Sequence, residues 1–329
     1  MRRIGIAGAT GLVGETLLKI LESADLKIDE LRLFASKLSA GKRLRFRDDE
    51  YLVEEVTVER FKSLDIAFFC LDNQFAQRLV PEVAKQCPVI DKSSEFRLEP
   101  EVPLVVPEVN PAALKGHQNI IANPNCTTIP LVVALNPLHQ EFGLKEIFLA
   151  SYQSVSGAGR EALEQLLYEN EFIVLGQTPD TKDSPFAAQI ADNIIPKIGE
   201  IEQDGYSAEE KKTILETKKI LNLPELAINS TCVRVPVTVG HSLAITAVFE
   251  KTVKVKKAVE ILKPAPGVVL KEDEKPLTPL DCRQKNDVFV SRIRQGATEN
   301  ELSLWVVVDN LYKGAATNAL QIARLLFSK

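Results

Sequence analysis

The stretch RIGIAGATGLVG, residues 3–14, decides the fold of the first part of this chain. An apolar run, Arg3–Ala7, ends at a glycine-rich turn, and apolar residues at helical spacing follow over Glu15–Ser23. Glycines at 8, 11 and 14 permit a tight turn and let main-chain N–H groups approach a pyrophosphate at a helix start. The stretch therefore predicts the first strand, loop and helix of a dinucleotide-binding domain; the alternative is a glycine-rich turn without a ligand.

Strands and helices continue to alternate after this loop. Glu30–Ala35 and Ile66–Cys70 have the composition of strands, a helix is expected from about Phe75 to Lys85, and Val89 begins another strand. Residues 44–46 and 52–56 are expected to form a hairpin or a meander insertion. This alternation predicts a parallel sheet covered on both faces.

The pattern changes at about residue 145. Four longer segments are rich in β-formers and fit an antiparallel sheet: 146–155, 227–235, 242–249 and 302–308. Helices are expected over Arg160–Gln165 and Ala208–Leu221, with an irregular excursion over 175–207. A last helical run, Gly314–Phe327, is expected to pack back on the first domain.

Composition excludes several classes of protein. The chain has 329 residues and a net charge of −5, which argues against a nucleic-acid binder with a basic surface. No apolar run approaches the roughly 20 residues that cross a bilayer, and no secretory signal is recognisable, so a cytoplasmic location is expected. The five cysteines form no Cys-x-x-Cys pair and only three histidines exist, so neither a metal site nor a disulfide framework is expected.

The second strand predicts which nicotinamide cofactor the loop binds. An NAD site usually has Asp or Glu about 20 residues beyond the glycine loop, to bind the ribose 2′-hydroxyl. Here Ala35 is followed by Ser36, Lys37, Leu38 and Ser39, without an acid. Hydroxyls and cations suit a 2′-phosphate, so NADP is favoured over NAD; the alternative is a solvated polar loop.

Cys126 differs from the other cysteines in its surroundings. It precedes an apolar helical run, Leu131–Leu138, and a helix N-terminus favours a thiolate and lowers the thiol pKa. Thr127 and Thr128 are suited to capping that helix, and Pro130 suits its first turn. Cys126 is therefore the predicted nucleophile, and a nucleophilic cysteine beside a nicotinamide cofactor indicates aldehyde or acyl chemistry through a thioester.

Several motifs, in order along the chain, resemble the phosphorylating, NADP-dependent aspartate-semialdehyde dehydrogenases. They are GATGLVG (8–14), SSEFRL (93–98), VPLVVPEVN (102–110), NPNCTT (123–128), YQSVSGAGR (152–160), DGYSAEEKK (204–212), ETKKIL (216–221), TCVRVPVTVGHS (231–242) and WVVVDNLYKGAATNALQIA (305–323). Their joint occurrence is far more specific than any one of them.

The resemblance implies a fold. It implies an α/β protein with a Rossmann-type nucleotide-binding domain, residues 1–127 and 312–329, whose C-terminal helix returns to it. Residues 128–311 would form an α+β catalytic and dimerisation domain with a mainly antiparallel sheet. The implied assembly is a homodimer, with a tetramer as the alternative.

The resemblance also implies roles for individual residues. Cys126 is similar to the nucleophile, His241 to the acid/base histidine, and Gln153 to the residue that orients substrate and thioester. Arg234 is similar to the arginine that pairs with the substrate carboxylate, for which a planar guanidinium is suited. Glu216 is similar to the acid that holds the substrate amino group. The implied phosphate-binding set is Arg97, Asn125 and Lys219, and the implied cofactor contacts are Gly8, Thr10, Gly11, Leu12, Val13, Gly14, Ser36, Lys37, Leu38, Ser39, Ser156, Gly157 and Asn310.

The implied reaction is the reductive dephosphorylation of 4-phospho-L-aspartate by NADPH, giving L-aspartate 4-semialdehyde for lysine, threonine and methionine biosynthesis. Simpler readings exist for single residues. Taken alone, His241 would more often be a structural residue, and Arg234 would be one arm of an ion pair. Arg97 would cap a loop, and Glu216 and Lys219 would form an exposed pair on a helix.

The chain departs from the family pattern in three places. Cys70–Gln74 replaces a run of small residues, Leu38 stands where an arginine usually meets the 2′-phosphate, and 91–94 reads DKSS. Two other functions are compatible with parts of the sequence. N-acetylglutamyl-phosphate reductases typically have Gly where this chain has Asn125, and a catalytically silent NADP-binding relative would lack the cysteine or histidine.

Overall fold

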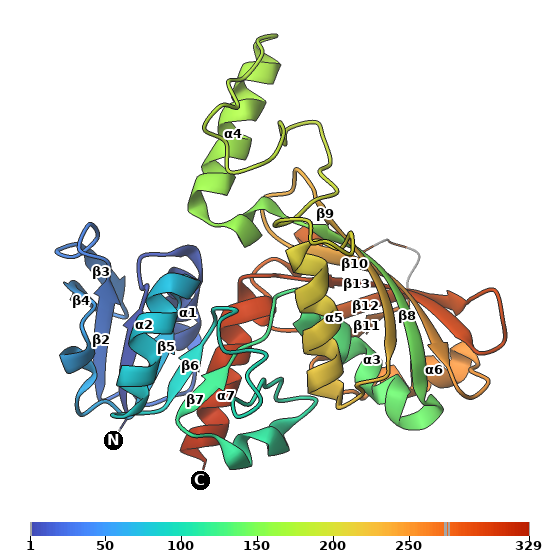
Figure 1. Ribbon diagram of the computed structural model, residues 1–329, viewed down its shortest axis with the longest axis horizontal. Coiled ribbons are helices and arrows are strands. Elements are labelled where there is room, and N and C mark those ends of the chain that lie inside the picture. The colour runs from blue at the N-terminus through green and yellow to red at the C-terminus, as the bar shows by residue number, and fades with distance from the viewer. Residues whose placement is uncertain (1, 273–274, 276, 329) are drawn as a thin grey trace. The chain divides into compact units, whose positions relative to one another are not determined.

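The computed structural model describes residues 2–272, 275 and 277–328, and its chain divides into two compact units. Unit 1 comprises Met1–Asn125 and Ala315–Lys329, and unit 2 comprises Cys126–Gly314. Each unit has its own sheet, and Figure 1 labels most of the helices and strands of both.

Unit 1 is built on a seven-stranded sheet in the order β3-β4-β2-β1-β5-β6-β7. Every pair is parallel except the hairpin of β3 and β4. The strands are β1 Arg3–Ala7, β2 Glu30–Ala35, β3 Arg43–Phe46, β4 Asp49–Glu55, β5 Ile66–Phe69, β6 Val89–Asp91 and β7 Ile120–Ala122. The predicted alternation is confirmed, and of the two forms expected for residues 44–56 the structure has the hairpin. The three-residue β7 was not predicted.

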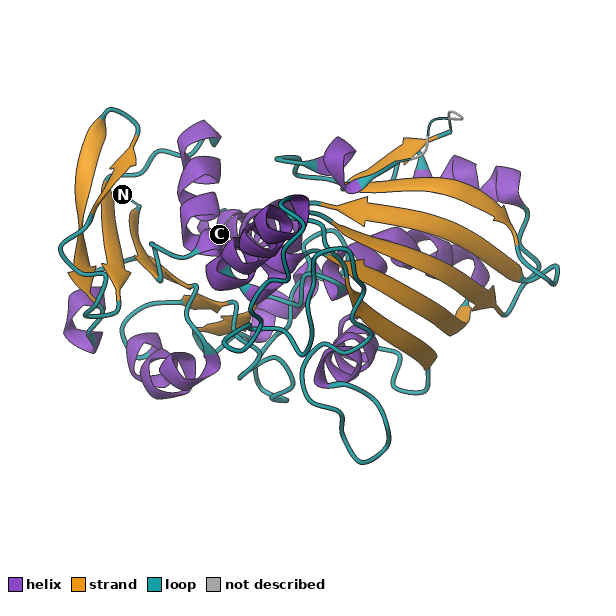
Figure 2. Cartoon of the chain, turned by 90° about the horizontal axis from the view of Figure 1, so that it is seen from above, coloured by secondary structure: helices purple, strands orange, loops and turns teal. Residues whose placement is uncertain are grey.

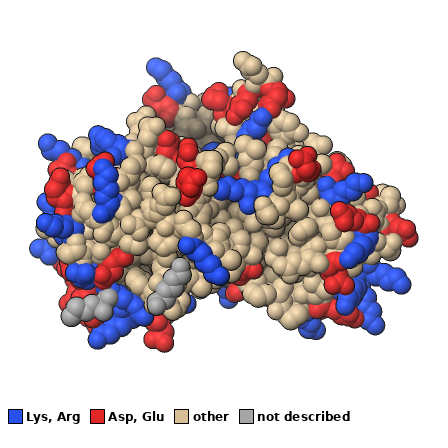
Figure 3. Space-filling model, turned by 60° about the horizontal axis from the view of Figure 1, so that its bottom comes forward, with Lys and Arg blue, Asp and Glu red and all other residues tan. Residues whose placement is uncertain are grey.

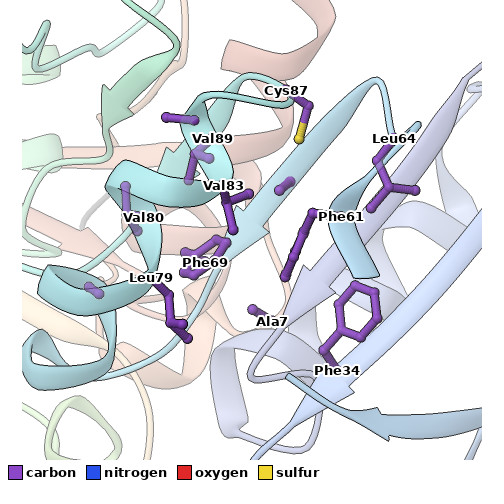
Figure 4. Close-up of a cluster of buried hydrophobic side chains, with 13 residues drawn as sticks. Ala7, Phe34, Phe61, Leu64, Phe69, Leu79, Val80, Val83, Cys87 and Val89 are labelled. Carbon is purple, nitrogen blue, oxygen red and sulfur yellow. The ribbon is translucent and has the colours of Figure 1, made fainter. Parts of the chain in front are cut away.

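The α-helices in the described part of unit 1 are α1 Leu12–Ser23, α2 Asn73–Ala84 and α7 Thr317–Phe327. Figure 4 shows the apolar cluster between α2 and the sheet, in which Phe61 packs against two other rings. Its ring centroid lies 4.6 Å from that of Phe34 and 5.3 Å from that of Phe69. Apolar residues spaced for one helical face, Val80 and Val83, complete the cluster from α2.

The C-terminal helix is part of unit 1. Asn318 is fully buried on α7, and its side-chain nitrogen donates to the Val105 carbonyl at 2.9 Å and to Oδ1 of Asn123 at 2.8 Å. The helical run expected from Gly314 is regular only from Thr317, because a π-helical turn, Tyr312–Ala316, precedes it.

Unit 2 contains a six-stranded mixed sheet in the order β11-β12-β13-β10-β8-β9. Three neighbouring pairs are antiparallel, and the edge pairs β11–β12 and β8–β9 are parallel. The strands are β8 Leu144–Gln153, β9 Ala227–Arg234, β10 His241–Phe249, β11 Val268–Lys271, β12 Val288–Gln295 and β13 Glu301–Val308. Figure 2 shows this sheet as a curved layer.

Helix α3, Thr128–Phe142, packs on one face of this sheet between α5, Ala208–Leu221, and α6, Val255–Leu262. The expected short helix at Arg160 is longer, because α4 spans Arg160–Val174. The excursion over 175–207 is irregular, as predicted, and is tied to α4 by a buried carboxylate. One oxygen of Glu169 accepts the N–H groups of Ile190 at 2.7 Å and Ala191 at 2.8 Å.

Candidate active site

Four strand ends meet at one edge of the unit 2 sheet. The parallel strands β8 and β9 place Gln153 opposite Arg234 at their C-terminal ends. The antiparallel strand β10 begins at His241, which is paired with Val308 at the end of β13. Because the side chains at these ends face a common region, the topology gathers residues that lie far apart in sequence.

Cys126 and His241 are in direct contact. Sγ of Cys126 lies 3.2 Å from Nε2 of His241, across 115 positions of sequence. Cys126 is half-buried two residues before α3, whereas His241 is fully buried. Burial and the charge of Arg234 lower the pKa of His241 to about 3, so the imidazole is neutral near neutral pH.

A buried polar cluster supports the imidazole. Nδ1 of His241 lies 3.1 Å from the main-chain nitrogen of Ser154 and 3.1 Å from its Oγ. Oδ1 of Asn310 accepts from Gly240 N at 2.9 Å, from Ser154 Oγ at 3.1 Å and from Ser156 Oγ at 3.2 Å. Ser156 and Asn310, expected as cofactor contacts, thus bond to each other inside unit 2. Sequence reasoning missed Ser154, whose only signal was its place beside Gln153.

Arg234 lies beside Ser154 and His241. Its Nη1 donates to the Ser154 carbonyl at 2.7 Å, and the side chain is buried. Burial lowers the pKa of Arg234, while the charges of Glu209 and Cys126 act in the opposite direction. Gly157 leaves room for the side chains of Arg234 and His241. A Cβ at position 157 would lie 3.0 Å from Nη1 of Arg234 and 3.3 Å from Nε2 of His241.

Gln153, Glu216 and Lys219 also belong to unit 2. Gln153 is buried, and its side-chain nitrogen donates to Oγ of Ser151 at 3.2 Å. Glu216 is 1% exposed on the buried face of α5, so the reading as an exposed pair with Lys219 is wrong. Helix α5 is fixed to β9, because Glu210 accepts the Cys232 N–H at 2.8 Å.

The helix that follows Cys126 starts without the expected side-chain caps. Helix α3 begins at Thr128, and Thr127 makes no capping hydrogen bond to its first turn. The expectation that threonines cap the helix is therefore wrong. The physical reason is that Thr127 has helical dihedral angles, φ −89° and ψ −35°, instead of the extended backbone that a capping side chain requires. Pro130 lies in the first turn, as expected.

The other cysteines are poor candidates for the nucleophile. Burial raises the pKa of Cys87 and Cys232 to about 11, and that of Cys70 and Cys282 to about 12. These four side chains are therefore neutral thiols near neutral pH, and neutral thiols are weak nucleophiles.

Unit 1 holds the remaining phosphate-set residues. Arg97 is 8% exposed, and its Nη2 donates to the Lys92 carbonyl at 2.6 Å. Asn125 is 7% exposed and directly precedes Cys126 in the sequence.

The glycine loop has the close packing that a dinucleotide site requires. Gly8 has φ +80°, and a Cβ on Gly14 would lie 2.2 Å from the Gly8 carbonyl oxygen, so neither position tolerates a side chain. Helix α1 begins after Gly11 without a side-chain cap, which leaves its first N–H groups to an anion. Thr10, Leu12 and Val13 surround this helix start.

The loop after β2 is a tight turn at the surface. Ser36 accepts the N–H groups of Ser39 at 2.9 Å and Ala40 at 3.0 Å. Lys37 is exposed and Leu38 is 95% exposed, although leucine is apolar. The departing segment at 70–74 has a defined role, because Asp72 caps α2 by accepting the Phe75 N–H at 3.1 Å.

Comparison with known proteins agrees with this geometry. Two family descriptions match: "Semialdehyde dehydrogenase, NAD binding domain" over residues 3–117 and "Semialdehyde dehydrogenase, dimerisation domain" over residues 135–313. An aspartate-semialdehyde dehydrogenase of Aquifex aeolicus is 45% identical, over 98% of this chain and 97% of that protein. An aspartate-semialdehyde dehydrogenase of Bacillus subtilis is 42% identical, over 98% of this chain and 96% of that protein.

Solved structures give the same result. The crystal structure of aspartate semialdehyde dehydrogenase II from Vibrio cholerae, complexed with ASA, has a TM-score of 0.96 and 39% identity, and covers 100% of this chain and 99% of that one. The match covers both units of this chain. This chain belongs to the semialdehyde dehydrogenase family.

Proposed function

We propose that this chain is an aspartate-semialdehyde dehydrogenase, an oxidoreductase that reduces 4-phospho-L-aspartate to L-aspartate 4-semialdehyde and phosphate, reversibly. The observation that carries the proposal is the 3.2 Å contact between Cys126 and His241, beside the buried guanidinium of Arg234, in a chain of this family. Relatives 40–45% identical over nearly the whole chain bear this name.

Cys126 performs the covalent chemistry. Its thiolate attacks the acyl carbon, and the carbon–oxygen bond to phosphate breaks, so that a thioester and free phosphate form. NADPH, when bound, supplies the hydride that reduces the thioester. The bond between carbon and sulfur then breaks and returns Cys126 to a thiolate. Main-chain N–H groups that bind the acyl oxygen contribute about 3 kcal/mol each in comparable sites.

The anionic substrate is held by buried polar groups. Arg234 binds the substrate carboxylate, since its remaining guanidinium donors suit bidentate binding. Glu216 binds the substrate ammonium group and Gln153 orients the acyl group. Arg97, Asn125 and Lys219 bind the phosphate.

NADP is the proposed cofactor. The family description and the glycine loop support a nicotinamide dinucleotide, and a related structure from Candida albicans was solved with NADP. The absence of an acid after β2, with Ser36, Lys37 and Ser39 in its place, supports the 2′-phosphate form. Ser156, Gly157 and Asn310 would contact the nicotinamide end of the cofactor.

A homodimer through unit 2 is proposed as the assembly. Helix α3 packs on one face of the sheet, whereas Phe148 is 43% exposed and Tyr152 is 38% exposed on the other. Tyr152 and Trp305 contact each other on this open face, with ring centroids 5.7 Å apart. Apolar aromatic side chains on a sheet face are typical of a subunit interface, and the family description names this region a dimerisation domain.

A cytoplasmic location is proposed from the biosynthetic reaction. In the described ranges of the chain, helices long and apolar enough to span a bilayer are absent. Figure 3 shows acidic and basic side chains interspersed over the face in view.

The decisive experiment measures semialdehyde oxidation with and without phosphate, using NADP and NAD. Cys126→Ala is expected to abolish phosphate-dependent turnover while NADP binding is retained, and Cys87→Ala, at a buried thiol, serves as the matched control. Turnover that persists in Cys126→Ala contradicts the proposal. Turnover of N-acetylglutamyl phosphate instead supports the reductase, and tight NADPH binding without turnover of either substrate supports a silent relative.

A further inference from the structure

The carboxylate of Asp309 binds main-chain N–H groups from two segments of unit 2. Its Oδ1 accepts the N–H of Leu311 at 2.9 Å and of Tyr312 at 3.1 Å, and its Oδ2 accepts the N–H of Gln284 at 2.8 Å. Asp309 directly follows β13 and is 2% exposed. Both oxygens of this buried carboxylate are therefore used, whereas an amide of the same size offers only one acceptor oxygen.

Asp309 shapes the turn that follows it. Its Oδ1 accepts N–H groups from two and three residues ahead, which is the pattern of a side chain that caps a helix start. The main-chain carbonyl of Asp309 accepts the N–H of Gly314 at 3.0 Å, and a bond that spans five residues is of the wide, π-helical kind. The side chain and the main chain of Asp309 thus together determine where Gly314 lies.

Gly314 lies against Cys126. A Cβ at position 314 would stand 3.1 Å from Cβ of Cys126 and 3.4 Å from its carbonyl oxygen. The backbone at Gly314 does not have a positive φ, so the neighbouring atoms exclude a larger residue there. Helix α3 starts without a side-chain cap, so a capping bond does not fix the approach of Cys126 to that helix. Gly314 therefore forms part of the support for the cysteine.

The same segment also reaches His241. Oδ1 of Asn310 accepts the Gly240 N–H at 2.9 Å, and Gly240 directly precedes His241. Asn310 and Gly314 therefore connect one short segment to both members of the Cys126–His241 pair. A displacement of this segment would change the 3.2 Å separation between the sulfur and Nε2.

The bond to Gln284 ties the segment to a second loop. Gln284 has φ +56°, a left-handed backbone that is disfavoured for residues with a Cβ, and Asp309 stabilises it by accepting its N–H. The neighbouring Arg283 donates to Oγ1 of Thr238 at 2.7 Å, in the connection that leads to β10. Burial raises the pKa of Asp309, and the three N–H groups that it accepts act against this rise. These donors favour the ionised carboxylate.

We propose that Asp309 is a positioning residue for the Cys126–His241 pair. Through Gly314 it supports the cysteine, and through Asn310 it supports the histidine. The effect on turnover rests on the proposed function, whereas the effect on the placement of Cys126 does not.

Alkylation of Cys126 by iodoacetamide tests the placement without any substrate. Mass spectrometry follows the peptide that contains Cys126, and the other cysteines are buried, neutral thiols near neutral pH. Asp309→Asn keeps one acceptor oxygen but turns an amide NH₂ toward a main-chain donor. The alkylation rate is expected to fall about threefold or more, because the sulfur moves away from the start of α3, which favours the thiolate.

Gly314→Ala reaches the cysteine by an independent route. It leaves the carboxylate of Asp309 in place and puts a Cβ 3.1 Å from that of Cys126. The same loss of alkylation rate is expected. If Asp309→Asn does not fold, Gly314→Ala decides, because an unchanged rate would break the link between the turn and the cysteine and overturn the proposal.

Two controls separate placement from a general loss of stability. Glu169→Gln likewise alters a buried carboxylate that accepts main-chain N–H groups, and it is expected to lower Tm without changing the alkylation of Cys126. Gln284→Gly keeps the N–H that Asp309 accepts and suits φ +56°, so it is expected to change neither quantity. Equal changes of alkylation rate in Asp309→Asn and Glu169→Gln would mean that Asp309 supports only the fold.

Turnover gives the second readout. With saturating phosphate and NADP, kcat of semialdehyde oxidation is expected to fall at least about tenfold in Asp309→Asn and to stay within about twofold of the wild type in Gln284→Gly. An unchanged kcat in Asp309→Asn contradicts the proposal. If the wild type does not turn over the semialdehyde while alkylation still falls in Asp309→Asn and Gly314→Ala, the proposed function fails and the placement of Cys126 by Asp309 stands.

Discussion

Gly157 lies against the imidazole of His241, so closely that a Cβ at position 157 would stand 3.3 Å from both Cε1 and Nε2. The same Cβ would lie 3.0 Å from Nη1 of Arg234. The backbone at Gly157 does not have a positive φ, so only the neighbouring side chains, and not the main chain, exclude a larger residue there.

Gly157→Ala is therefore expected to displace His241 and Arg234 and to lower kcat/KM by at least about tenfold, or ~1.4 kcal/mol. Thermal unfolding is expected to change little, because two side-chain ends can give way. Gly116→Ala, where a Cβ meets nothing within 4 Å, is the control. Unchanged kcat/KM with a lower Tm would show that the main chain moves instead.

The neutral state of His241 gives the stability a pH dependence with a definite sign. Its pKa is lower in the folded chain, about 3, than the ordinary value of 6.5. Below about pH 6.5 the unfolded chain takes up a proton that the folded chain does not, so this contribution to stability is complete above that pH and decreases as the pH falls. The loss has a slope of up to about 1.4 kcal/mol per pH unit.

His241→Gln is expected to remove this part of the pH dependence. Denaturation curves of both proteins at pH values between about 4 and about 8 measure it. Parallel pH dependence in wild type and variant would mean that His241 titrates alike in the folded and unfolded chains.

The buried carboxylate of Glu169 is expected to hold the irregular segment 175–207. Glu169→Gln replaces one acceptor oxygen by a donor that faces the N–H groups of Ile190 and Ala191, which is expected to cost roughly 1–3 kcal/mol. Denaturation and limited proteolysis of the segment measure this. The exposed Glu164→Gln is the matched control, and equal proteolysis rates for the two variants would contradict the assignment.

The exposed Leu38 is expected to limit affinity for NADP. Leu38→Arg places a guanidinium where the family resemblance implies one, and KM for NADPH is expected to fall by about tenfold or more while KM for NADH stays the same. The effect should weaken at high salt. Leu280→Arg, also at an exposed leucine, controls for added charge. Equal changes with both cofactors would show that position 38 does not meet the 2′-phosphate.

The open face of the unit 2 sheet is expected to form the dimer. Phe148→Arg places a charge among aromatic residues and should yield monomers in sedimentation at micromolar concentration, because a buried unpaired charge is costly. Leu52→Arg, in unit 1, is expected to leave the mass unchanged. A dimer that persists in Phe148→Arg would place the interface elsewhere.

Local sequence predicted the helices and strands in which apolar residues recur with a clear period. β8 alternates more and less buried side chains over Ile147–Gln153, and its predicted bounds were two residues off at each end. α5, which starts with a capping box at Ser207, was predicted with the same bounds. β12 was missed because its first four residues are all buried and Arg292, with φ 52°, interrupts its pairing. α6 was missed because eight residues with two buried side chains give little pattern.

Sequence indicated the site mainly through family resemblance. Local pattern identified Cys126 and the glycine loop, because both depend on neighbouring residues. The partnership of Ser154 with His241 and Asn310 spans 87 and 156 positions, and no local pattern encodes it. The threonine caps failed for a related reason, since the dihedral angles of Thr127 are set by the fold and not by its side chain.

The connection from β9 to β10 explains why Arg234 and His241 are seven positions apart. Residues 235–240 pass over the end of β8, where Val237 and Thr238 accept the N–H groups of Val155 and Ser156. Side chains alternate along a strand, so an insertion or deletion of one residue that shifted β10 would turn the imidazole to the opposite face of the sheet. The length of this short connection thus sets which face of the sheet His241 occupies. Activity should tolerate substitutions in residues 235–240 better than insertions or deletions.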